Sequence, residues 1–130
     1  MTGNRASDFR VKLNQRVHLT GVWDISLVSI VFDNIDIKTL NNKQIHLNVL
    51  CNLCDGSEVG GVRLPILRNI DLREGSHHEF NTLWKFPIIP RELSQVRIYI
   101  QDESGAEATF ITGETRVVLV LRRYPFIDTY

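Results

Sequence analysis

Apolar and polar residues alternate one by one along most of this chain, and that period of two constrains the fold more than any other feature. It is the pattern of a β-strand with one face in a core and the other in solvent. No stretch of twelve residues has the spacing of an amphipathic helix. Between Leu27 and Val28 the alternation changes phase, which predicts a β-bulge. The alternating runs lie at 9–19, 23–32, 45–51, 96–101 and 117–121.

Turn-forming residues separate these runs. Prolines at 65, 87 and 90 mark strand ends or sheet edges. About eight short strands with turns between them predict an all-β protein, an antiparallel β-sandwich in which eight strands match a single jelly roll. An immunoglobulin-like sandwich is the main alternative, but Cys51 and Cys54 stand too close together for its Cys–Trp–Cys signature. The turn signals are Asn41-Asn42, Asp55-Gly56-Ser57, Gly60-Gly61, Glu74-Gly75-Ser76, Ser104-Gly105 and Thr112-Gly113.

The length of 130 residues fits one domain. Small polar residues predict a flexible N-terminal arm over 1–8, followed by the sandwich over 9–123. Residues 124–130 form an aromatic tail that must pack either on its own domain or on a neighbour. Trp23 and Trp84 lie in or beside the strand-like runs, where a tryptophan is more often a core residue than a site residue. The expected interface residues are those of the tail together with one tryptophan: Tyr124, Phe126, Ile127, Tyr130 and Trp84.

The charges balance, with 15 basic and 15 acidic side chains. A neutral chain lacks the basic face that wraps DNA, so no direct nucleic-acid binding is expected. Arg63, Arg68 and Arg73 recur at five-residue spacing, but Asp71 and Glu74 interrupt any basic stripe. No apolar run is long enough to span a membrane, and the first residues do not resemble a secretory signal. The expected location is intracellular or in a virion.

Cysteine and histidine offer the first candidates for chemistry. Cys51-Asn52-Leu53-Cys54 has redox-motif spacing, yet the residues after it form a loop instead of the helix that would activate a thiolate. Cys51 is better interpreted as a small core residue. His77 and His78 are adjacent on a predicted strand, so they point to opposite faces and cannot share a zinc ion. We predict no metal and no cofactor.

Carboxylates offer the second candidates. Asp102 and Glu103 precede Ser104-Gly105 and are typical of a turn, and Asp33 and Asp36 are also loop-like. No pair resembles the acid and base of a glycosidase. The sequence therefore predicts no catalytic residues and a protein that is not an enzyme.

Three segments carry a resemblance to a known family. The first, 19–27, contains Thr20-Gly21-Val22-Trp23-Asp24. The second, 51–68, runs from Cys51 through Val59-Gly60 to Pro65-Ile66-Leu67-Arg68. The third, 98–123, has the spacing of a final hairpin with Gly105, Phe110 and Gly113. In order and content they resemble the jelly-roll capsid proteins of Polinton (Maverick) elements and the related adintoviruses. Gly61 departs from the family's usual Asp, and the chain has room for only one jelly roll.

The resemblance implies a structural virion protein, of the minor capsid, penton-like or cement kind. It implies self-assembly through sheet edges, loops and the tail into a homo-oligomer such as a trimer or pentamer, with other capsid proteins as partners. The alternative function is a ligand-binding β-sandwich such as a carbohydrate-binding module. That alternative would use exposed aromatic side chains, for which Trp84 and Tyr99 are the candidates.

Overall fold

A computed structural model describes residues 4–36, 46–54, 57–59 and 62–123. Within these residues the chain is almost entirely β-strand, with one short 3-10 turn, η2 (Leu72–Glu74), and no helix that could cross a membrane. The strands are β1 (Asp8–His18), β2 (Trp23–Ile35), β3 (His46–Cys51), β4 (Ser57–Val59), β5 (Val62–Leu64), β6 (Ile66–Asp71), β7 (His77–Glu79), β8 (Phe86–Pro87), β9 (Glu92–Asp102) and β10 (Ile111–Arg123).

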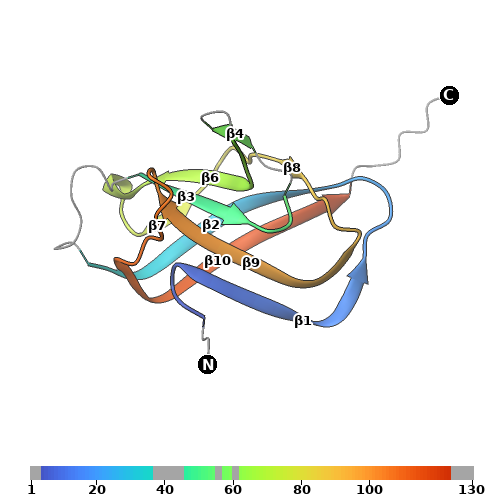
Figure 1. Cartoon of the computed structure of the whole chain (residues 1–130), viewed down its shortest axis with the longest axis horizontal. Coiled ribbons are helices and arrows are strands. Elements are labelled where there is room, and N and C mark those ends of the chain that lie inside the picture. The colour runs from blue at the N-terminus through green and yellow to red at the C-terminus, as the bar shows by residue number, and fades with distance from the viewer. Residues whose placement is uncertain (1–3, 37–45, 55–56, 60–61, 124–130) are drawn as a thin grey trace.

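Two antiparallel sheets form the layers of the molecule (Figure 1). The first sheet has the strand order β1-β9-β3-β6, and the second has the order β10-β2-β7, with β8 also paired to β2. Strands β4 and β5 form a separate small hairpin. The predicted all-β antiparallel sandwich is confirmed. The finer jelly-roll connectivity is not established by these pairings, in which β9 lies between β1 and β3 and β10 pairs with β2.

The core lies between the sheets, as the alternation predicts. On β2, Ile25, Leu27, Ile30 and Phe32 are at most 2% exposed. They form one cluster with the buried apolar side chains of β3, β6 and β9. Burying a side chain of this size stabilises the fold by roughly 1.5–3 kcal/mol.

The bulge predicted at Leu27–Val28 is present. Leu27 pairs with Leu119 while Ser29 pairs with Val118, so Val28 is the extra residue on β2. Because of this insertion, Leu27 and Ile30 both face the core although three positions separate them. The bulge therefore explains why the apolar residues of this strand change phase.

Candidate functional sites at the two open sides of the sandwich

Each sheet ends in strands that face the edge of the other sheet, and these two sides of the sandwich differ in chemistry. On one side β1 of the first sheet faces β10 of the second. On the other side β6 of the first sheet faces β7 of the second. Edge strands present backbone groups that lack a partner within their own sheet, so both sides are places where other molecules can bind.

The β1/β10 side holds an apolar groove of about 230 Å³. Its walls come from three strands that are far apart in the sequence. Val11 on β1 is 54% exposed, a large value for an apolar side chain on a strand. The groove is lined by Phe9, Val11, Val96, Ile98, Val117 and Leu119.

This groove stays open because β1 pairs only with β9 and β10 pairs only with β2 among the described strands. Near one end of the groove the Thr115 hydroxyl donates to the carbonyl of Ala6, at 2.7 Å. The groove is thus a gap between two unpaired edges.

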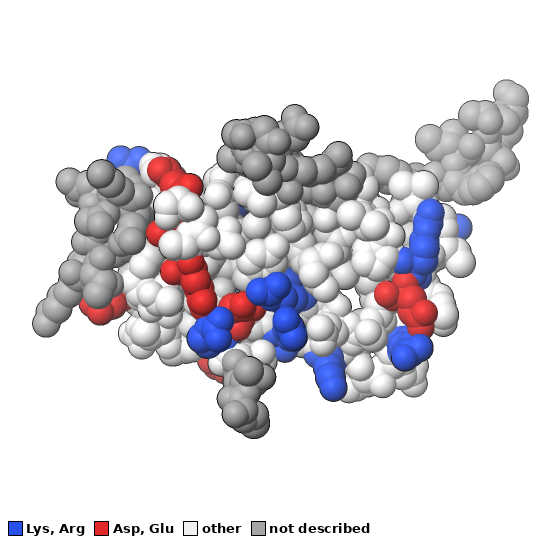
Figure 2. Space-filling model, in the orientation of Figure 1, with Lys and Arg blue, Asp and Glu red and all other residues white. Residues whose placement is uncertain are grey.

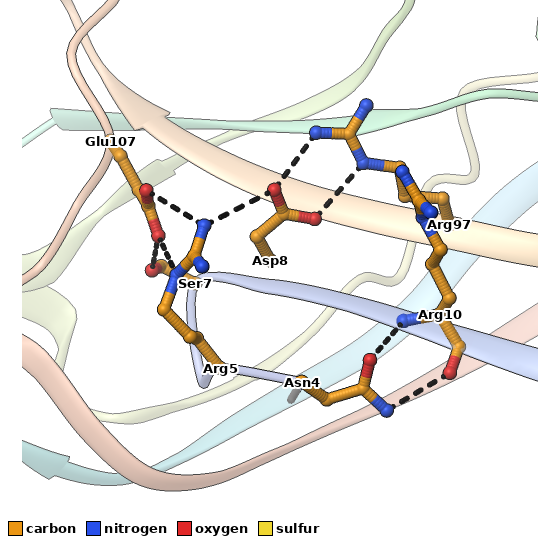
Figure 3. A network of polar contacts seen from close by, with 7 residues as sticks. All are labelled: Asn4, Arg5, Ser7, Asp8, Arg10, Arg97 and Glu107. Atoms are coloured by element: carbon orange, nitrogen blue, oxygen red, sulfur yellow. Dashed lines mark hydrogen bonds and ion pairs between the residues drawn. The ribbon is translucent and has the colours of Figure 1, made fainter. Parts of the chain in front are cut away.

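A polar network fixes the start of β1 (Figure 3). The Asp8 carboxylate accepts two hydrogen bonds from the guanidinium of Arg97 on β9, at 2.8 and 3.0 Å. Arg5 pairs with Glu107 at 2.8 Å, and the Ser7 hydroxyl donates to the same carboxylate at 2.6 Å. Residues far apart in sequence therefore hold one wall of the groove in place.

These contacts change the ionisation of the carboxylates. Hydrogen bonds from Arg97 lower the pKa of Asp8, and hydrogen bonds from Arg5 and Ser7 lower the pKa of Glu107. Both groups are therefore ionised at neutral pH. The guanidinium of Arg97 also lies over the ring of Tyr99, 4.3 Å from its centroid.

The β6/β7 side holds a polar pocket of about 430 Å³. At its wall the guanidinium of Arg68 lies between two aromatic rings, 4.2 Å from the centroid of Phe80 and 4.2 Å from that of Trp84. One guanidinium nitrogen donates to the carbonyl of Thr82 at 2.8 Å. The pocket is lined by Arg68, Asn69, Ile70, Asp71, Glu74, His78, Glu79, Phe80, Asn81, Thr82 and Trp84.

Acidic groups surround the remainder of this pocket. Asp71 is bound by the side chain and backbone of Arg73, which lowers its pKa to about 2. Glu74 and Glu79 are exposed. The buried His78 ring is fixed through its Nε2, 2.7 Å from the Gly75 carbonyl. The pocket thus combines one stacked cation, carboxylates and an exposed tryptophan.

The predicted interface residues divide between described and undescribed parts of the chain. Trp84 is 42% exposed, borders the polar pocket and contacts the guanidinium of Arg68. Tyr124, Phe126, Ile127 and Tyr130 lie outside the described residues. Tyr99 does not line the polar pocket and contacts Arg97 elsewhere.

The candidates weighed for chemistry are separated in space. Cys51 and Cys54 are buried thiols, and burial raises the pKa of Cys51 to about 11. His77 is exposed while His78 is buried, because adjacent strand residues face opposite ways. In the part of the chain that the structure describes, no group of three or more His, Cys, Asp or Glu side chains is arranged to hold a metal ion.

Asp24 was not expected to be buried. It is 2% exposed. Within the described part of the chain neither of its carboxylate oxygens has a hydrogen-bond partner, and the same holds for the hydroxyl of Ser26. In register, Asp24 pairs with Arg122 of β10 and Pro87 of β8. The sequence shows that Asp24 alternates in phase with Ser26 and out of phase with Ile25. It does not show that Asp24 is buried.

No family model, no curated protein and no solved structure matches this chain.

Proposed function

We propose that this chain is a structural, self-assembling protein of the capsid type, acting in a virion as a minor capsid, penton-like or cement protein. One observation carries the proposal: two long edge strands, of 11 and 13 residues, flank an open apolar groove. The resemblance of the three sequence segments to Polinton and adintovirus capsid proteins supports the viral setting. The partner in the groove is a second copy of this chain.

Backbone chemistry favours such a contact. An edge strand can accept a neighbouring strand through its unpaired N–H and C=O groups, while alternate side chains fill the adjoining groove. Covering Val11 and the groove walls removes apolar surface from water at roughly 25 cal/mol per Å². Assembly therefore gains from both strand pairing and apolar burial.

The charges on β1 and β10 indicate which surfaces of two copies come into contact. Strands β1 and β10 each carry three basic side chains and one acidic side chain. Basic groups gather over the lower part of the face shown in Figure 2, where Figure 1 places β1. Like charges oppose a symmetric contact of this side with itself, so the neighbour must offer a different surface.

A contact between two different surfaces is heterologous, and it closes into a ring when the rotation between copies allows. This accords with the trimer or pentamer that the family resemblance implies. The number of copies in such a ring is set by the rotation between neighbours. Light scattering measures that number directly.

The test compares two valines of nearly equal exposure. Val11 lines the groove at 54% exposed, whereas Val22, in the loop between β1 and β2, is 56% exposed. We expect size-exclusion chromatography with light scattering to show an oligomer for the wild-type chain. Val11→Lys should give a folded monomer because a charge in the groove must be desolvated, and Val22→Lys should assemble normally.

Two outcomes would contradict the proposal. One is a wild-type chain that remains at 15.0 kDa at about 100 µM, well above the dissociation constants of stable interfaces. The other is equal loss of assembly in both variants. Circular dichroism on each variant separates loss of assembly from loss of fold.

The alternative function, ligand binding, has support in the polar pocket and its exposed Trp84. The two functions use opposite sides of the sandwich and are compatible in one molecule.

A further inference from the structure

Arg68 occupies an unusual position for a charged residue. It pairs in register with Val49, which is completely buried, and it alternates in phase with the buried Ile70. Its side chain therefore leaves β6 from the face that lies toward the core. Phe80 and Trp84, from the segment between β7 and β8, each lie with the ring centroid 4.2 Å from the carbon of its guanidinium. The cation is thus held against aromatic rings at the wall of the polar pocket.

The hydrogen-bonding capacity of this guanidinium is mostly unused. It has five N–H donors in a fixed planar fork. Among the described residues it donates to the Thr82 carbonyl and makes no ion pair. Burial lowers the pKa of Arg68 because it disfavours the charged form. A guanidinium with unused donors favours a ligand that brings an acceptor with it.

The acceptor best matched to a planar guanidinium fork is a carboxylate, which takes two parallel hydrogen bonds. Phosphate can also bind such a fork, but three carboxylates, Asp71, Glu74 and Glu79, line the same pocket. A ligand with two negative charges would be repelled more than one with a single charge. The ligand that fits this pocket best carries one carboxylate and is otherwise uncharged.

The other residues that line the pocket indicate what the neutral part of the ligand is. Trp84 is 42% exposed and offers apolar ring surface of the kind that packs against the C–H groups of a sugar. Asn69 and Asn81 offer both donors and acceptors, and the carboxylates of Glu74 and Glu79 accept from hydroxyl groups. An apolar ligand would leave these polar groups without partners.

We infer that the polar pocket between β6 and β7 is a binding site for a sugar that carries one carboxylate, with Arg68 binding the carboxylate and Trp84 packing on the ring. This site does not depend on the proposed assembly, because it uses the opposite side of the sandwich. A carboxylated sugar at a cell surface is then a ligand through which the protein recognises a glycan.

The experiment titrates the whole chain with methyl glucuronide, the methyl glycoside of N-acetylneuraminic acid, neutral methyl glucoside and glucose 6-phosphate. Saturation-transfer NMR reports binding whether or not the chain assembles, and tryptophan fluorescence follows Trp84. We expect at least one carboxylated sugar to bind with a dissociation constant of about 1 mM or lower. The neutral and phosphorylated sugars should bind at least about tenfold more weakly.

Variants identify the residues. Arg68→Met should weaken binding of the carboxylated sugar by about tenfold or more, the value of a lost charge-assisted hydrogen bond, while leaving the neutral sugar unaffected. Trp84→Ala should weaken both. Arg116→Gln, which removes an exposed arginine on the far side of the sandwich, is the matched control and should bind as the wild type does.

Several results would overturn the inference: no binding of either carboxylated sugar at roughly 20 mM, tighter binding of glucose 6-phosphate, or an equal loss in Arg68→Met and Arg116→Gln. If Arg68→Met does not fold, Trp84→Ala and the ranking of the four sugars on the wild-type chain still decide the question. Loss of assembly in Val11→Lys would leave these sugar-binding measurements unchanged. The assembly proposal and the sugar-binding proposal can therefore be contradicted independently.

Discussion

Among the described residues two arginines stack on aromatic rings, and their different partners give them different roles. Arg97 lies over Tyr99, but its guanidinium is already bound by the carboxylate of Asp8. Arg68 lies between Phe80 and Trp84 and has a backbone carbonyl as its partner. Arg97 therefore has a structural role, because it holds the start of β1 against β9. Arg68 retains its capacity to bind a ligand, which makes it the better candidate for function.

Asp24 gives the clearest prediction for a single residue. A charged carboxylate buried without hydrogen bonds costs more free energy than a neutral amide of the same shape. We expect Asp24→Asn to raise the free energy of unfolding by about 1–3 kcal/mol, measured by urea denaturation of the purified chain.

The control for this variant is Asp33→Asn, which neutralises an exposed acid on the same strand. It should change stability by less than about 0.5 kcal/mol. A lower stability for Asp24→Asn would show that the carboxylate has a favourable role in the folded chain, and the prediction would be wrong.

At the scale of elements, the irregularity in β10 between Thr112 and Thr115 depends on one glycine. Gly113 has a φ of +79°, and a Cβ placed there would lie 2.5 Å from the Asp33 carboxylate and 2.9 Å from the Cβ of Asp33. Gly105 has a similar φ of +89°, with nothing within 4 Å of a Cβ. Gly113 and Gly105 therefore share a positive φ, but of these two positions a Cβ would contact a neighbouring side chain at Gly113 alone.

Gly113→Ala should therefore destabilise the protein more than Gly105→Ala does. The positive φ alone costs roughly 1–2 kcal/mol in each variant, and Gly113→Ala adds the displacement of β2 against β10. Thermal and urea unfolding of the two variants give the comparison. Equal losses would mean that Asp33 moves aside freely.

The C-terminal segment gives a second prediction for an element. It is rich in aromatic residues, and the sequence predicts that it is an assembly contact. Deleting residues 124–130 should abolish the oligomer seen by light scattering while leaving the circular dichroism spectrum and thermal midpoint nearly unchanged. Unchanged assembly would remove this segment from the interface.

The sequence predicted the elements well where one face of a strand is buried. Alternation located β1, β2, β3, β9 and β10, and the phase change at Leu27–Val28 located the bulge. Local pattern carries this information because a strand's side chains alternate between faces. It does not carry the order of strands in a sheet, since pairing depends on contacts between distant segments, such as Asp8 with Tyr99.

The two sites were harder to predict for the same reason. The apolar groove needs β1, β9 and β10 together, and no local pattern shows that their edges remain apart. Arg68 had a usable signal, a charge in phase with Ile66 and Ile70 on a strand, but its aromatic partners come from a separate loop. Trp84 was selected as an exposed aromatic, and the structure adds what it stacks on.

For the whole molecule, the paired carboxylates predict acid sensitivity. Ion pairs hold the pKa values of Asp8 and Glu107 below their ordinary values of 3.8 and 4.5, and that of Asp71 at about 2. A carboxylate with a lowered pKa in the folded state stabilises the fold above its unfolded pKa. That stabilisation is lost as the pH falls through the folded value.

Stability should therefore be nearly constant from pH 7 to about 5 and fall between about pH 4.5 and 2. Urea midpoints measured across this range give the curve. Asp8→Asn should be less stable at neutral pH and should show a shallower fall in acid, because one of the linked groups is gone. A curve identical to that of the wild type would show that the Asp8–Arg97 pair contributes nothing.

The pairing of β1 with β9 has a consequence for how the protein is made. These partners stand about ninety residues apart, so at a synthesis rate of roughly 5–20 residues per second β1 waits for roughly 5–20 s before β9 leaves the ribosome. During that time Phe9, Val11 and Leu13 have no sheet to join. Arg10, Lys12 and Arg16 interrupt this stretch with charges that discourage aggregation of the nascent chain.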